Sequence, residues 1–414
     1  MTWPPSCGNQ TAMDGIAVIG AGVTGVLTAY NLARNGHRVV LFDRHDQAAM
    51  ETSFANGGQI SVSNAEVWNN WHSVGTALRT MFRDDAPLRI GLWPDWHKLS
   101  WFAEFAREGL RWRDNTAELA RMALYSRQCL RDVAEGEGIA FDRRDTGLLH
   151  IYKTKAQFDA ALGTNALLTG TGLERYPVTP EEIRNIEPAL AGDVHAGLYT
   201  PGDFAGDIHM FTRGLLDVCR RLGVKTRFGA PVSEIAATDG GVTIHDGRGA
   251  EAFGNVVICA GVGSRRLAAM LGDRVNVYPV KGYSLTFDID PAAARGGAPV
   301  TALLDEDAKI VTSRLGDRLR IAGLAEFRGM DTSIDPRRIR TLYDWTSRHF
   351  PGLEQDSVTE WAGLRPMTPR MIPRVGRGRL PGVYYNTGHG HLGWTLSAGT
   401  AETIAGIIVG DTQV

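Results

Sequence analysis

The most constraining feature of the sequence is a glycine-rich turn near its start, because this turn connects two strand-like segments through a helix. Gly15–Ile19 reads GIAVI, a short buried strand, and Gly20–Gly25 follows as GAGVTG. From Val23 onward, apolar residues recur at helical spacing. Arg38–Phe42 reads RVVLF, a second strand that leads directly into Asp43. This order of strand, GxGxxG turn, helix, strand and acidic residue predicts a βαβ unit that binds a dinucleotide.

Each glycine of the turn has a separate physical task in such a unit. Gly20 allows the tight turn, Gly22 lets a phosphate approach the backbone, and Gly25 lets the helix pack on the strand. The helix N-terminus stabilises the pyrophosphate. Asp43 accepts hydrogen bonds from a ribose diol and would repel a 2′-phosphate, which disfavours NADP although Arg44 follows. The alternative is a purely structural glycine turn. The predicted cofactor contacts in this unit are Gly20, Ala21, Gly22, Val23, Thr24, Gly25, Asp43 and Arg44.

Two further segments indicate that the dinucleotide is FAD. Thr52–Gln59 reads TSFANGGQ, a polar loop whose hydroxyls and backbone amides can wrap a pyrophosphate and a flavin. Asn255–Cys259 reads NVVIC, a strand followed by the small residues of Ala260–Ser264, which permit close passage beside the cofactor. The predicted contacts of this part of the chain are Thr52, Ser53, Asn56, Gly57, Gly58, Gln59, Ile60, Val232, Ala260 and Gly261.

A second glycine-rich loop lies near the other end of the chain. Asn386–Thr395 reads NTGHGHLGWT and runs into a helix that we expect from about Leu396. A helix N-terminus is partly positive, so it suits the negative charge that develops on a flavin ring during reduction. The alternative is a glycine-rich surface turn. The predicted contacts here are Gly388, Gly390, His391, Leu392, Gly393 and Thr395, together with Gly363 from the preceding segment.

Composition excludes several classes of protein. The 44 Lys and Arg nearly balance the 46 Asp and Glu, whereas nucleic-acid binders usually carry a basic bias. The four cysteines form no CxxC pair, so neither a zinc site nor a disulfide framework is indicated. The sequence shows no signal peptide and no apolar run long enough to span a membrane. We therefore expect a cytoplasmic protein with no metal site. The 49 glycines are the outlier, and we expect many of them beside the dinucleotide.

The alternation of strands and helices at both ends of the chain, around a β-rich middle, predicts the fold class. We expect an α/β protein, α+β overall, with a Rossmann-like FAD-binding domain and an inserted substrate domain based on a β-sheet. The predicted FAD-binding domain is discontinuous and comprises residues 14–85, 205–275 and 360–414. Residues 86–204 and 276–359 form the predicted substrate domain, or cap.

Six segments appear in an order that is typical of one family. They read GAGVTG, ETSFANGGQIS, APLRI, YPVKGYSLT, GLRPMTP and NTGHGHLGWT. Over about residues 14–410 the chain resembles the FAD-dependent D-amino-acid dehydrogenases (small-subunit type) of the glycine oxidase and D-amino-acid oxidase superfamily. The resemblance implies oxidative deamination of D-amino acids to 2-oxo acids and ammonia, by transfer of a hydride from the α-carbon to flavin N5.

The resemblance also implies the substrate-binding residues. Arg365, in GLRP, matches the arginine that holds the substrate carboxylate, and such a clamp is expected to be bidentate. Tyr283, in KGYS, matches an aromatic position beside the substrate, although a core tyrosine with a satisfied hydroxyl is an alternative. His389 and His391 flank the flavin loop and could bind flavin or substrate, or could only stabilise the loop. Lys281 is the weakest candidate, since it also suits the strand surface.

Departures from the family pattern affect two questions, namely which substrate is used and whether the flavin is covalently attached. Asn64–Trp71 reads NAEVWNNW, which is more polar than in relatives, so the substrate choice is open. No cysteine follows Cys259, and Asn56 stands where some relatives use a histidine. The resemblance therefore implies non-covalent FAD. The alternatives are a D-proline or hydroxy-D-proline dehydrogenase, a glycine or sarcosine oxidase and, in another class, a non-catalytic FAD-binding subunit.

Tryptophan and basic residues concentrate in residues 68–113, which bears on the electron acceptor. Aromatic and basic residues together suit a membrane interface, where a quinone could take the electrons. We expect a quinone or another acceptor, with peripheral contact to the inner face of the cytoplasmic membrane. The alternative is a packed helical cap. The tryptophans concerned are six of the ten in the chain: Trp68, Trp71, Trp93, Trp96, Trp101 and Trp112.

Overall fold

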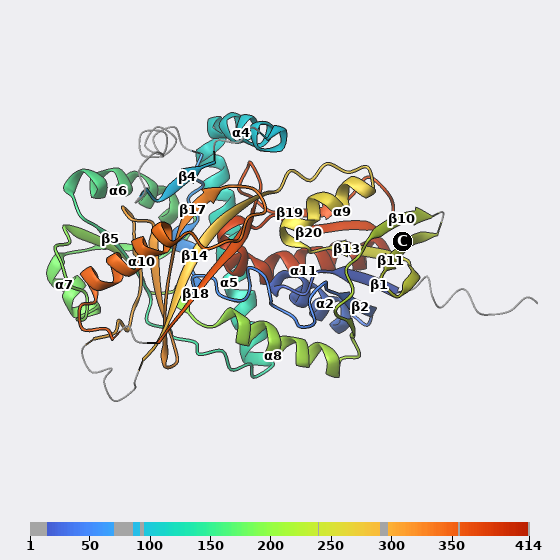
Figure 1. Cartoon of the computed structure of the whole chain (residues 1–414), viewed down its shortest axis with the longest axis horizontal. Coiled ribbons are helices and arrows are strands. Elements are labelled where there is room, and N and C mark those ends of the chain that lie inside the picture. The colour runs from blue at the N-terminus through green and yellow to red at the C-terminus, as the bar shows by residue number, and fades with distance from the viewer. Residues whose placement is uncertain are drawn as a thin grey trace, which may run out of the picture.

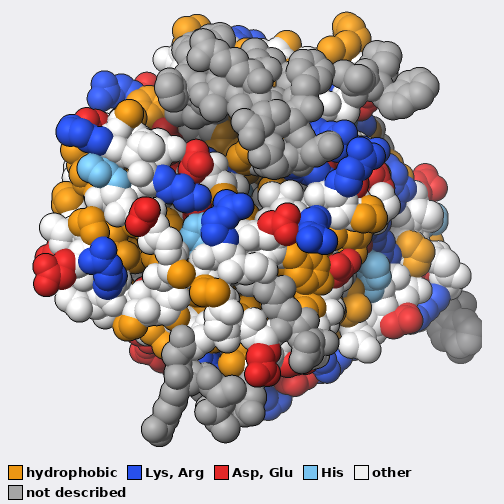
Figure 2. All heavy atoms as spheres, turned by 60° about the vertical axis from the view of Figure 1, so that its left-hand side comes forward, with side chains coloured by type: hydrophobic (Ala, Val, Ile, Leu, Met, Phe, Trp, Pro, Cys, Tyr) orange, Lys and Arg blue, Asp and Glu red, His pale blue; other side chains and the backbone are white. Residues whose placement is uncertain are grey.

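The structure of the chain is a computed structural model, and it describes residues 15–69, 86–91, 95–238, 240–289, 297–354 and 357–412. Two large sheets organise it, the smaller on the right and the larger on the left of Figure 1. The predicted fold class, an α/β unit joined to a unit based on a β-sheet, is confirmed. On the face shown in Figure 2, Lys and Arg side chains are interspersed with Asp and Glu, as the near-zero net charge suggests.

The smaller sheet has six strands and is built around the predicted βαβ unit. Its two first strands lie side by side in parallel, with Ile16 opposite Val39 and Val18 opposite Leu41. The first strand is buried along its whole length, as expected of a central parallel strand without polar side chains. The strand order is β19 (Arg374–Arg377), β20 (Val383–Thr387), β13 (Asn255–Ile258), β1 (Gly15–Ile19), β2 (Arg38–Phe42) and β9 (Lys225–Arg227).

Both faces of the smaller sheet are covered. On one face three helices pack with the sheet into a hydrophobic core that includes Tyr30, Phe211 and Ile404. The other face packs against a short helix and a three-stranded antiparallel sheet, through residues such as Phe253 and Leu267. The elements of the first face are α2 (Val23–Arg34), α8 (Ile208–Arg221) and α11 (Gly393–Thr412), and those of the second are α9 (Ser264–Met270), β10 (Glu234–Thr238), β11 (Gly241–Asp246) and β12 (Gly249–Phe253).

The last helix, α11, begins at Gly393, slightly before the expected start near Leu396. The stretch Gly390–Asp411 is long and apolar enough to cross a membrane, but 67% of its apolar window is buried inside the protein. Its residues Ala401, Ile404 and Ile408 belong to the hydrophobic core on α2 and α8. The apolar character of α11 is therefore accounted for by its place in the core.

The larger sheet has nine strands, most of them antiparallel. One face is covered by α10 (Pro336–His349), where Leu342 and Trp345 pack against Leu285 and Phe287. The other face meets the loop that follows β2, since the Ser284 hydroxyl donates to the carbonyl of Ala55 at 3.0 Å. The strand order is β18 (Val358–Met367), β14 (Tyr278–Asp288), β17 (Arg318–Phe327), β16 (Ile310–Leu315), β15 (Ala302–Asp305), β5 (Leu148–Tyr152), β7 (Ala196–Thr200) and β6 (Tyr176–Val178), with β4 (Leu88–Ile90) paired to β17.

The strand β18 lies on the larger sheet, although residues 360–414 are predicted in the FAD-binding domain. β18 pairs with β14 along its whole length, with Arg365 opposite Val280 and Gly363 opposite Gly282. Sequence periodicity cannot show this pairing, because β14 lies far upstream in the chain. Arg365 is therefore carried by the larger sheet, and not by the unit built around the smaller sheet.

The long helix α5 (Trp112–Gly136) lies between the two units. It falls within the predicted substrate domain, yet it packs on α11, where the amide of Gly399 donates to the Ser126 hydroxyl at 2.9 Å. The remaining described elements are β3 (Gln59–Ile60), η1 (Val62–Asn64), α4 (Trp96–Glu108), η2 (Gly109–Arg111), α6 (Lys155–Thr169), α7 (Pro180–Ile186), β8 (Phe204–Ala205), η3 (Gly261–Gly263) and η4 (Gly390–Leu392).

Candidate active site

A single large cavity lies between the dinucleotide unit and the larger sheet. Its volume is about 1900 Å³, which exceeds the several hundred Å³ typical of a site for one small ligand. Its wall contains the glycine-rich turn after β1, the loop after β2, the strands β14, β17 and β18, and the loop before α11. Segments from both ends of the chain therefore surround one space that can hold an extended ligand and a second, smaller one.

The glycine-rich turn is shaped by close backbone contacts. Gly20 has φ +106°, and a Cβ at this position would lie 2.6 Å from the carbonyl oxygen of Cys259. A Cβ on Gly25 would lie 1.8 Å from the carbonyl oxygen of Gly20, so α2 can approach β1 only with glycine there. Gly22 is the N-cap of α2 and has no side-chain cap, and the next amide, of Val23, donates to the Ser53 hydroxyl at 3.1 Å. This helix end therefore faces the cavity without a carboxylate, as an anion site requires.

Asp43 lies at the carboxyl end of β2, on the cavity wall. Its carboxylate accepts the amide of Ala21 at 2.6 Å and the amide of His45 at 2.9 Å, which fixes its orientation. Arg44 is paired with Glu51, so its charge is already balanced. An oriented acidic residue beside a neutralised arginine suits a ribose diol better than a 2′-phosphate.

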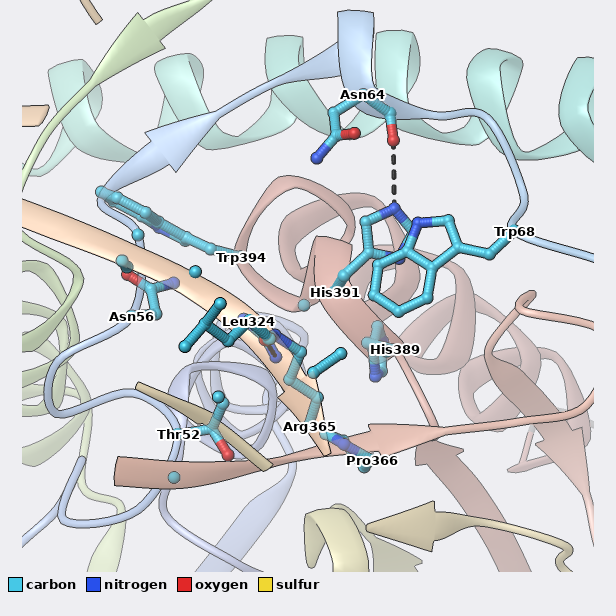
Figure 3. A pocket seen from close by; sticks show the side chains of 18 of the residues that line it. Thr52, Asn56, Asn64, Trp68, Leu324, Arg365, Pro366, His389, His391 and Trp394 are labelled. Atoms are coloured by element: carbon cyan, nitrogen blue, oxygen red, sulfur yellow. Dashed lines mark hydrogen bonds between the residues drawn. The ribbon is translucent and has the colours of Figure 1, made fainter. Parts of the chain in front are cut away.

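The loop Thr52–Gln59 is held by three strands of the larger sheet. The Thr52 hydroxyl donates to the carbonyl of Leu364 on β18 at 2.7 Å. On β16 the Ser313 hydroxyl donates to the carbonyl of Gly57 at 2.7 Å, and on β17 Arg320 donates to the carbonyl of Asn56 at 3.0 Å. The backbone of this loop is thus fixed, with the side chain of Asn56 in the cavity wall (Figure 3).

Two buried polar atoms in the C-terminal part of the cavity wall have no hydrogen-bond partner among the described residues. They are the indole Nε1 of Trp394, at the start of α11, and the Oδ1 of Asn386, at the end of β20. Buried polar groups are normally satisfied, so both indicate a ligand that supplies a partner. Neither residue is among the predicted cofactor contacts, although both lie in the NTGHGHLGWT segment.

Arg365 is a buried cation on the cavity wall that the larger sheet forms. Its Nη1 donates to the carbonyl of Leu324 at 2.9 Å, and no carboxylate pairs with it among the described residues. Burial lowers the pKa of Arg365 to about 10, so the guanidinium remains charged at neutral pH. The side chain crosses β14 at Gly282, where a Cβ would lie 2.4 Å from Nη1. A buried arginine without a counter-ion, beside a cavity, indicates an anionic ligand.

The carbonyl of Leu324 is aimed at Arg365 by an uncommon backbone conformation. Leu324 has φ +62°, in the left-handed region that leucine rarely adopts. It lies opposite an irregularity in the β14–β17 register, between Lys281 and Tyr283. Strained residues of this kind persist where the surroundings hold them, and they are frequent at active sites. No sequence signal identifies Leu324, because the irregularity arises from strand pairing.

Of the two predicted histidines, His391 faces the cavity with Arg365 (Figure 3). Its Nε2 lies 3.0 Å from the carbonyl of Asn64, and its ring packs on Trp68 at 4.7 Å between centroids. Burial and the charge of Arg365 lower the pKa of His391 to about 4, so it is neutral at pH 7. His389 also lines the cavity, but its Nε2 is 2.9 Å from the Thr400 hydroxyl, and burial lowers its pKa to about 3.

Tyr283 does not join Arg365. It forms part of the cavity wall, but its hydroxyl donates to Glu326 at 3.0 Å and its ring packs in the core under α10. Lys281 lies beside it and pairs with Glu326 and Asp331, at 3.4 Å and 3.1 Å. In strand alternation both residues fall on the opposite face from Val280, the neighbour of Arg365. The placement matches the alternative of a core tyrosine with a satisfied hydroxyl, and it gives Lys281 an internal structural contact.

Most of the predicted cofactor residues line the cavity, and six do not. Ile60 and Leu392 are in hydrophobic cores, the Thr395 hydroxyl accepts the amide of Ser61, and the others support the wall from behind. The six outside the wall are Ala21, Gly25, Gly58, Ile60, Leu392 and Thr395. Those in the wall are Gly20, Gly22, Val23, Thr24, Asp43, Arg44, Thr52, Ser53, Asn56, Gly57, Gln59, Val232, Ala260, Gly261, Gly363, Gly388, Gly390, His391 and Gly393.

The tryptophan-rich stretch is partly a packed cap and partly surface. The indole of Trp101 is buried and donates to the carbonyl of Met367 at 2.9 Å, and the indole of Trp112 donates to the carbonyl of Val67 at 3.2 Å. Trp96, at the start of α4, is 82% exposed. Trp71 and Trp93 lie outside the described residues.

The cavity fits FAD on the observations above. The N-terminus of α2, where Val23 meets only the neutral Ser53 hydroxyl, and the glycine turn suit a pyrophosphate. Asp43 suits a ribose, and Trp394 and Asn386 present unpaired polar atoms where the flavin would lie. Bound there, FAD would be held by backbone and polar contacts. Cys259 is buried at the end of β13 beside Gly20, and neither of the other described cysteines lines the cavity.

Comparison with known proteins gives one consistent result. A D-amino acid dehydrogenase 3 of Mesorhizobium japonicum is 50% identical over 414 residues, with 97% of this chain and 98% of that protein covered. A D-amino acid dehydrogenase of Paramagnetospirillum magneticum is 42% identical over 408 residues, with 95% of each chain covered.

Solved structures share the fold at lower identity. Glycine oxidase from Geobacillus kaustophilus superposes with a TM-score of 0.75 at 21% identity, covering 95% of this chain and 94% of that one. L-proline dehydrogenase from P. horikoshii gives 0.74 at 18% identity, covering 96% and 94%. The family model described as FAD dependent oxidoreductase (DAO) matches residues 15–407. The chain therefore belongs to the DAO family of FAD-dependent oxidoreductases.

Proposed function

We propose that the protein oxidises D-amino acids to 2-oxo acids and ammonia. The observation that carries this proposal is Arg365, a charged and buried guanidinium without a carboxylate partner among the described residues, on the wall opposite the dinucleotide turn. Its guanidinium can donate two parallel hydrogen bonds to an α-carboxylate. The names of the two relatives above, which match nearly the whole chain, support a D-amino acid as the substrate.

The residues of the chain act by binding and orientation. Arg365 holds the carboxylate, and the carbonyl of Leu324 fixes the guanidinium. When bound, FAD supplies the two-electron acceptor for the hydrogen of the α-carbon. The substrate ammonium group must release one proton to solvent for the hydride of the α-carbon to leave and an imino acid to form. His391 is neutral at pH 7, so it adds no second positive charge that would repel that ammonium group. The imino acid product is hydrolysed by water, and the protein needs no residue for that step.

The test is anaerobic reduction of the purified yellow protein by a panel of amino acids. We expect D-amino acids to bleach the flavin absorbance near 450 nm within seconds, roughly in line with a typical turnover of 1–10³ s⁻¹, while the L-enantiomers do not. Bleaching by D-proline or hydroxy-D-proline alone would support the secondary-amine dehydrogenases, and by glycine or sarcosine alone the oxidase group. A protein that no amine reduces, although dithionite does, would favour the non-catalytic FAD-binding subunit.

For the electron acceptor we propose a quinone, reached from the apolar side of the same cavity. Under α4 the cavity wall is formed by apolar side chains, including Leu88, Ile90, Phe102 and Phe105. α4 and the turn after it also expose apolar side chains to solvent, with Trp96 at 82%, Leu99 at 52% and Leu110 at 79%. Arg107 and Arg111 lie in the same segment, and this combination suits an anionic lipid surface. We therefore propose a cytoplasmic protein that contacts the membrane peripherally through α4.

Two measurements address this second proposal. Reoxidation of the reduced protein should be at least tenfold faster with a short-chain ubiquinone than with air-saturated buffer, and the reverse order would identify an oxidase. In flotation with vesicles that contain anionic lipid, the protein should rise with the vesicles, and a Trp96→Ser, Leu110→Ser variant should remain below. Each buried large apolar side chain contributes about 1.5–3 kcal/mol, so the double variant should lose most of the binding.

A further inference from the structure

A chain of four polar residues lies in and behind the cavity wall, and the proposed function leaves it unexplained. The Ser63 hydroxyl is 2.9 Å from Nε2 of His150, and Nδ1 of His150 is 2.7 Å from Glu306. The other carboxylate oxygen of Glu306 accepts from Nζ of Lys309 at 2.5 Å. His150 is fully buried and Ser63 nearly so, yet Ser63, Glu306 and Lys309 all line the cavity.

The position of each proton in this chain follows from the charges. Burial, together with the charge of Arg175, lowers the pKa of His150 to about 4, so the ring is neutral at pH 7 and carries one N–H. The charge of Lys309 and the contact with His150 keep the pKa of Glu306 low against its burial, so Glu306 is a carboxylate. The single N–H of His150 therefore donates to Glu306, and Nε2 accepts. Ser63 must then donate to His150, which leaves only the lone pairs of its oxygen free to act.

These four hydrogen-bonded residues lie beyond Arg365, toward the strands that follow β17 in the order of the larger sheet. Arg365 reaches Leu324 on β17, and the preceding residue, Gly323, pairs with Ile310 on β16. Neighbouring strands are about 4.8 Å apart, so Lys309 lies roughly one strand spacing from Leu324. The charges of Arg365 and Lys309 both act on His391, which the carbonyl of Asn64 holds next to Ser63. A substrate with its carboxylate on Arg365 thus has room to extend its side chain toward Ser63.

The charges around this end of the cavity are balanced. Lys309, Arg175 and Lys153 supply three positive charges, and Glu306, Glu66 and Asp307 supply three negative ones, all in the cavity wall. Arg175 is 7% exposed, and its Nε has no hydrogen-bond partner among the described residues. A charged side chain would disturb the balance, whereas a neutral group with both a donor and an acceptor would match it.

The order Ser63, His150, Glu306 also resembles the arrangement of a nucleophilic serine, but the surroundings contradict that role. The amides of Val62 and Ser63 donate to the carboxylate of Asp203 at 3.1 Å and 2.9 Å. Asp203 pairs in turn with Arg127 at 2.8 Å. The amides that could stabilise an oxyanion beside Ser63 are therefore occupied by a carboxylate.

We propose that Ser63, oriented by His150 and Glu306, is a specificity-determining residue that accepts a hydrogen bond from a neutral polar side chain of the substrate, such as the carboxamide of D-glutamine. Ser63 touches the substrate, and His150 and Glu306 are positioning residues that act through it. This inference rests on the proposed function, since it assumes a D-amino acid with its carboxylate on Arg365.

The experiment measures kcat/KM for four D-amino acids of similar length with the wild-type holoenzyme: D-glutamine, D-glutamate, D-lysine and D-norleucine. We expect D-glutamine to exceed each of the other three by about tenfold, the effect of one well-placed hydrogen bond in a buried site. A Ser63→Ala variant should lose most of this tenfold advantage, while kcat/KM for D-norleucine changes less than threefold. Ser126→Ala is the matched control, because Ser126 is as buried as Ser63 but lies between α5 and α11, outside the cavity wall.

The positioning role has a signature that a merely structural role would not give. In a His150→Phe variant the Ser63 hydroxyl is free to turn and donate a hydrogen bond. The ratio of kcat/KM for D-glutamate to kcat/KM for D-glutamine should therefore rise at least threefold. The ratio of the two substrates is measured within one variant, so partial misfolding cancels. If the wild type does not prefer D-glutamine, or if Ser63→Ala leaves the preference intact, the inference is wrong. If no D-amino acid reduces the flavin at all, it is the proposed function that fails.

Discussion

The two walls of the cavity are built by different means. The proposed dinucleotide wall is formed by backbone, with Gly20, Gly22 and the N-terminus of α2, and its glycine turn is shaped within one short βαβ unit. The proposed substrate wall is formed by side chains on β14, β17 and β18, which are joined by pairing between distant segments. Binding at the first wall therefore requires glycines, which have no Cβ and allow a close approach to the backbone. Binding at the second wall requires one charged side chain, that of Arg365, to be correctly placed. Substitutions should separate the two.

The largest effect should come from removing the cation of the substrate wall. Replacing Arg365 by leucine removes the charged partner of the substrate carboxylate, so kcat/KM should fall by about 10³-fold, the cost of truncating one side of a buried charge pair. FAD content should stay near that of the wild type. The kcat/KM of Arg365→Lys should lie between those of the wild type and Arg365→Leu, because lysine keeps the charge but cannot donate two parallel hydrogen bonds. Steady-state kinetics with absorbance at 450 nm decides this, and near-normal activity of Arg365→Leu would refute the assignment.

The next effect should break the dinucleotide wall. In Gly25→Ala, the added Cβ would lie 1.8 Å from the carbonyl oxygen of Gly20, so α2 must move away from β1. We expect a protein that is purified mostly without FAD and is destabilised by about 3 kcal/mol. The control is Gly406→Ala, an exposed helical site with nothing within 4 Å, which should gain about 0.5–1 kcal/mol. Flavin content and thermal unfolding measure both, and full FAD content in Gly25→Ala would contradict the comparison.

A smaller effect should show that one glycine serves the substrate wall. In Gly282→Ala the new Cβ would lie 2.4 Å from Nη1 of Arg365, so the guanidinium must shift. Misplacement by about 1 Å can cost 10²-fold, and we expect a loss of that order in kcat/KM with FAD retained. The double variant Gly282→Ala, Arg365→Leu should be no worse than Arg365→Leu alone. If the two losses instead multiply, Gly282 acts independently of Arg365.

The smallest effect concerns how the free energy of unfolding depends on pH, through the three buried histidines in and near the cavity wall. Burial places the pKa values of His150, His389 and His391 at about 4, 3 and 4, below the usual 6.5. At a pH between these lowered pKa values and 6.5, the unfolded chain binds more protons than the folded protein. The free energy of unfolding therefore falls as the pH drops from 6.5 toward 4. Each histidine contributes up to about 1.4 kcal/mol per pH unit. Denaturant unfolding should show a shallower acid slope in His389→Asn, and an unchanged slope would contradict the buried neutral state.

The same contrast explains what could be predicted from the sequence. The turn from Gly20 to Asp43 is local, and its residue order alone predicted a dinucleotide site from residues that mostly line one cavity in the structure. The resemblance supplied Arg365, whose neighbours in the chain contain no sign of its role. The role of Leu324, the placement of Tyr283 under α10 and the chain behind Ser63 depend on register between strands far apart in sequence. A pattern of alternating residues specifies a strand but not its partner.

The position of α11 in the core has a consequence for how the chain matures. Because α11 packs against α2 and lines the cavity with Trp394, the core on the N-terminal βαβ unit is completed only by residues near the end of the chain. During synthesis, domains usually fold as they emerge, whereas here the first and last parts of the chain share one core. We therefore expect a chain that is truncated before α11 to lack this part of the cavity wall and to retain little FAD.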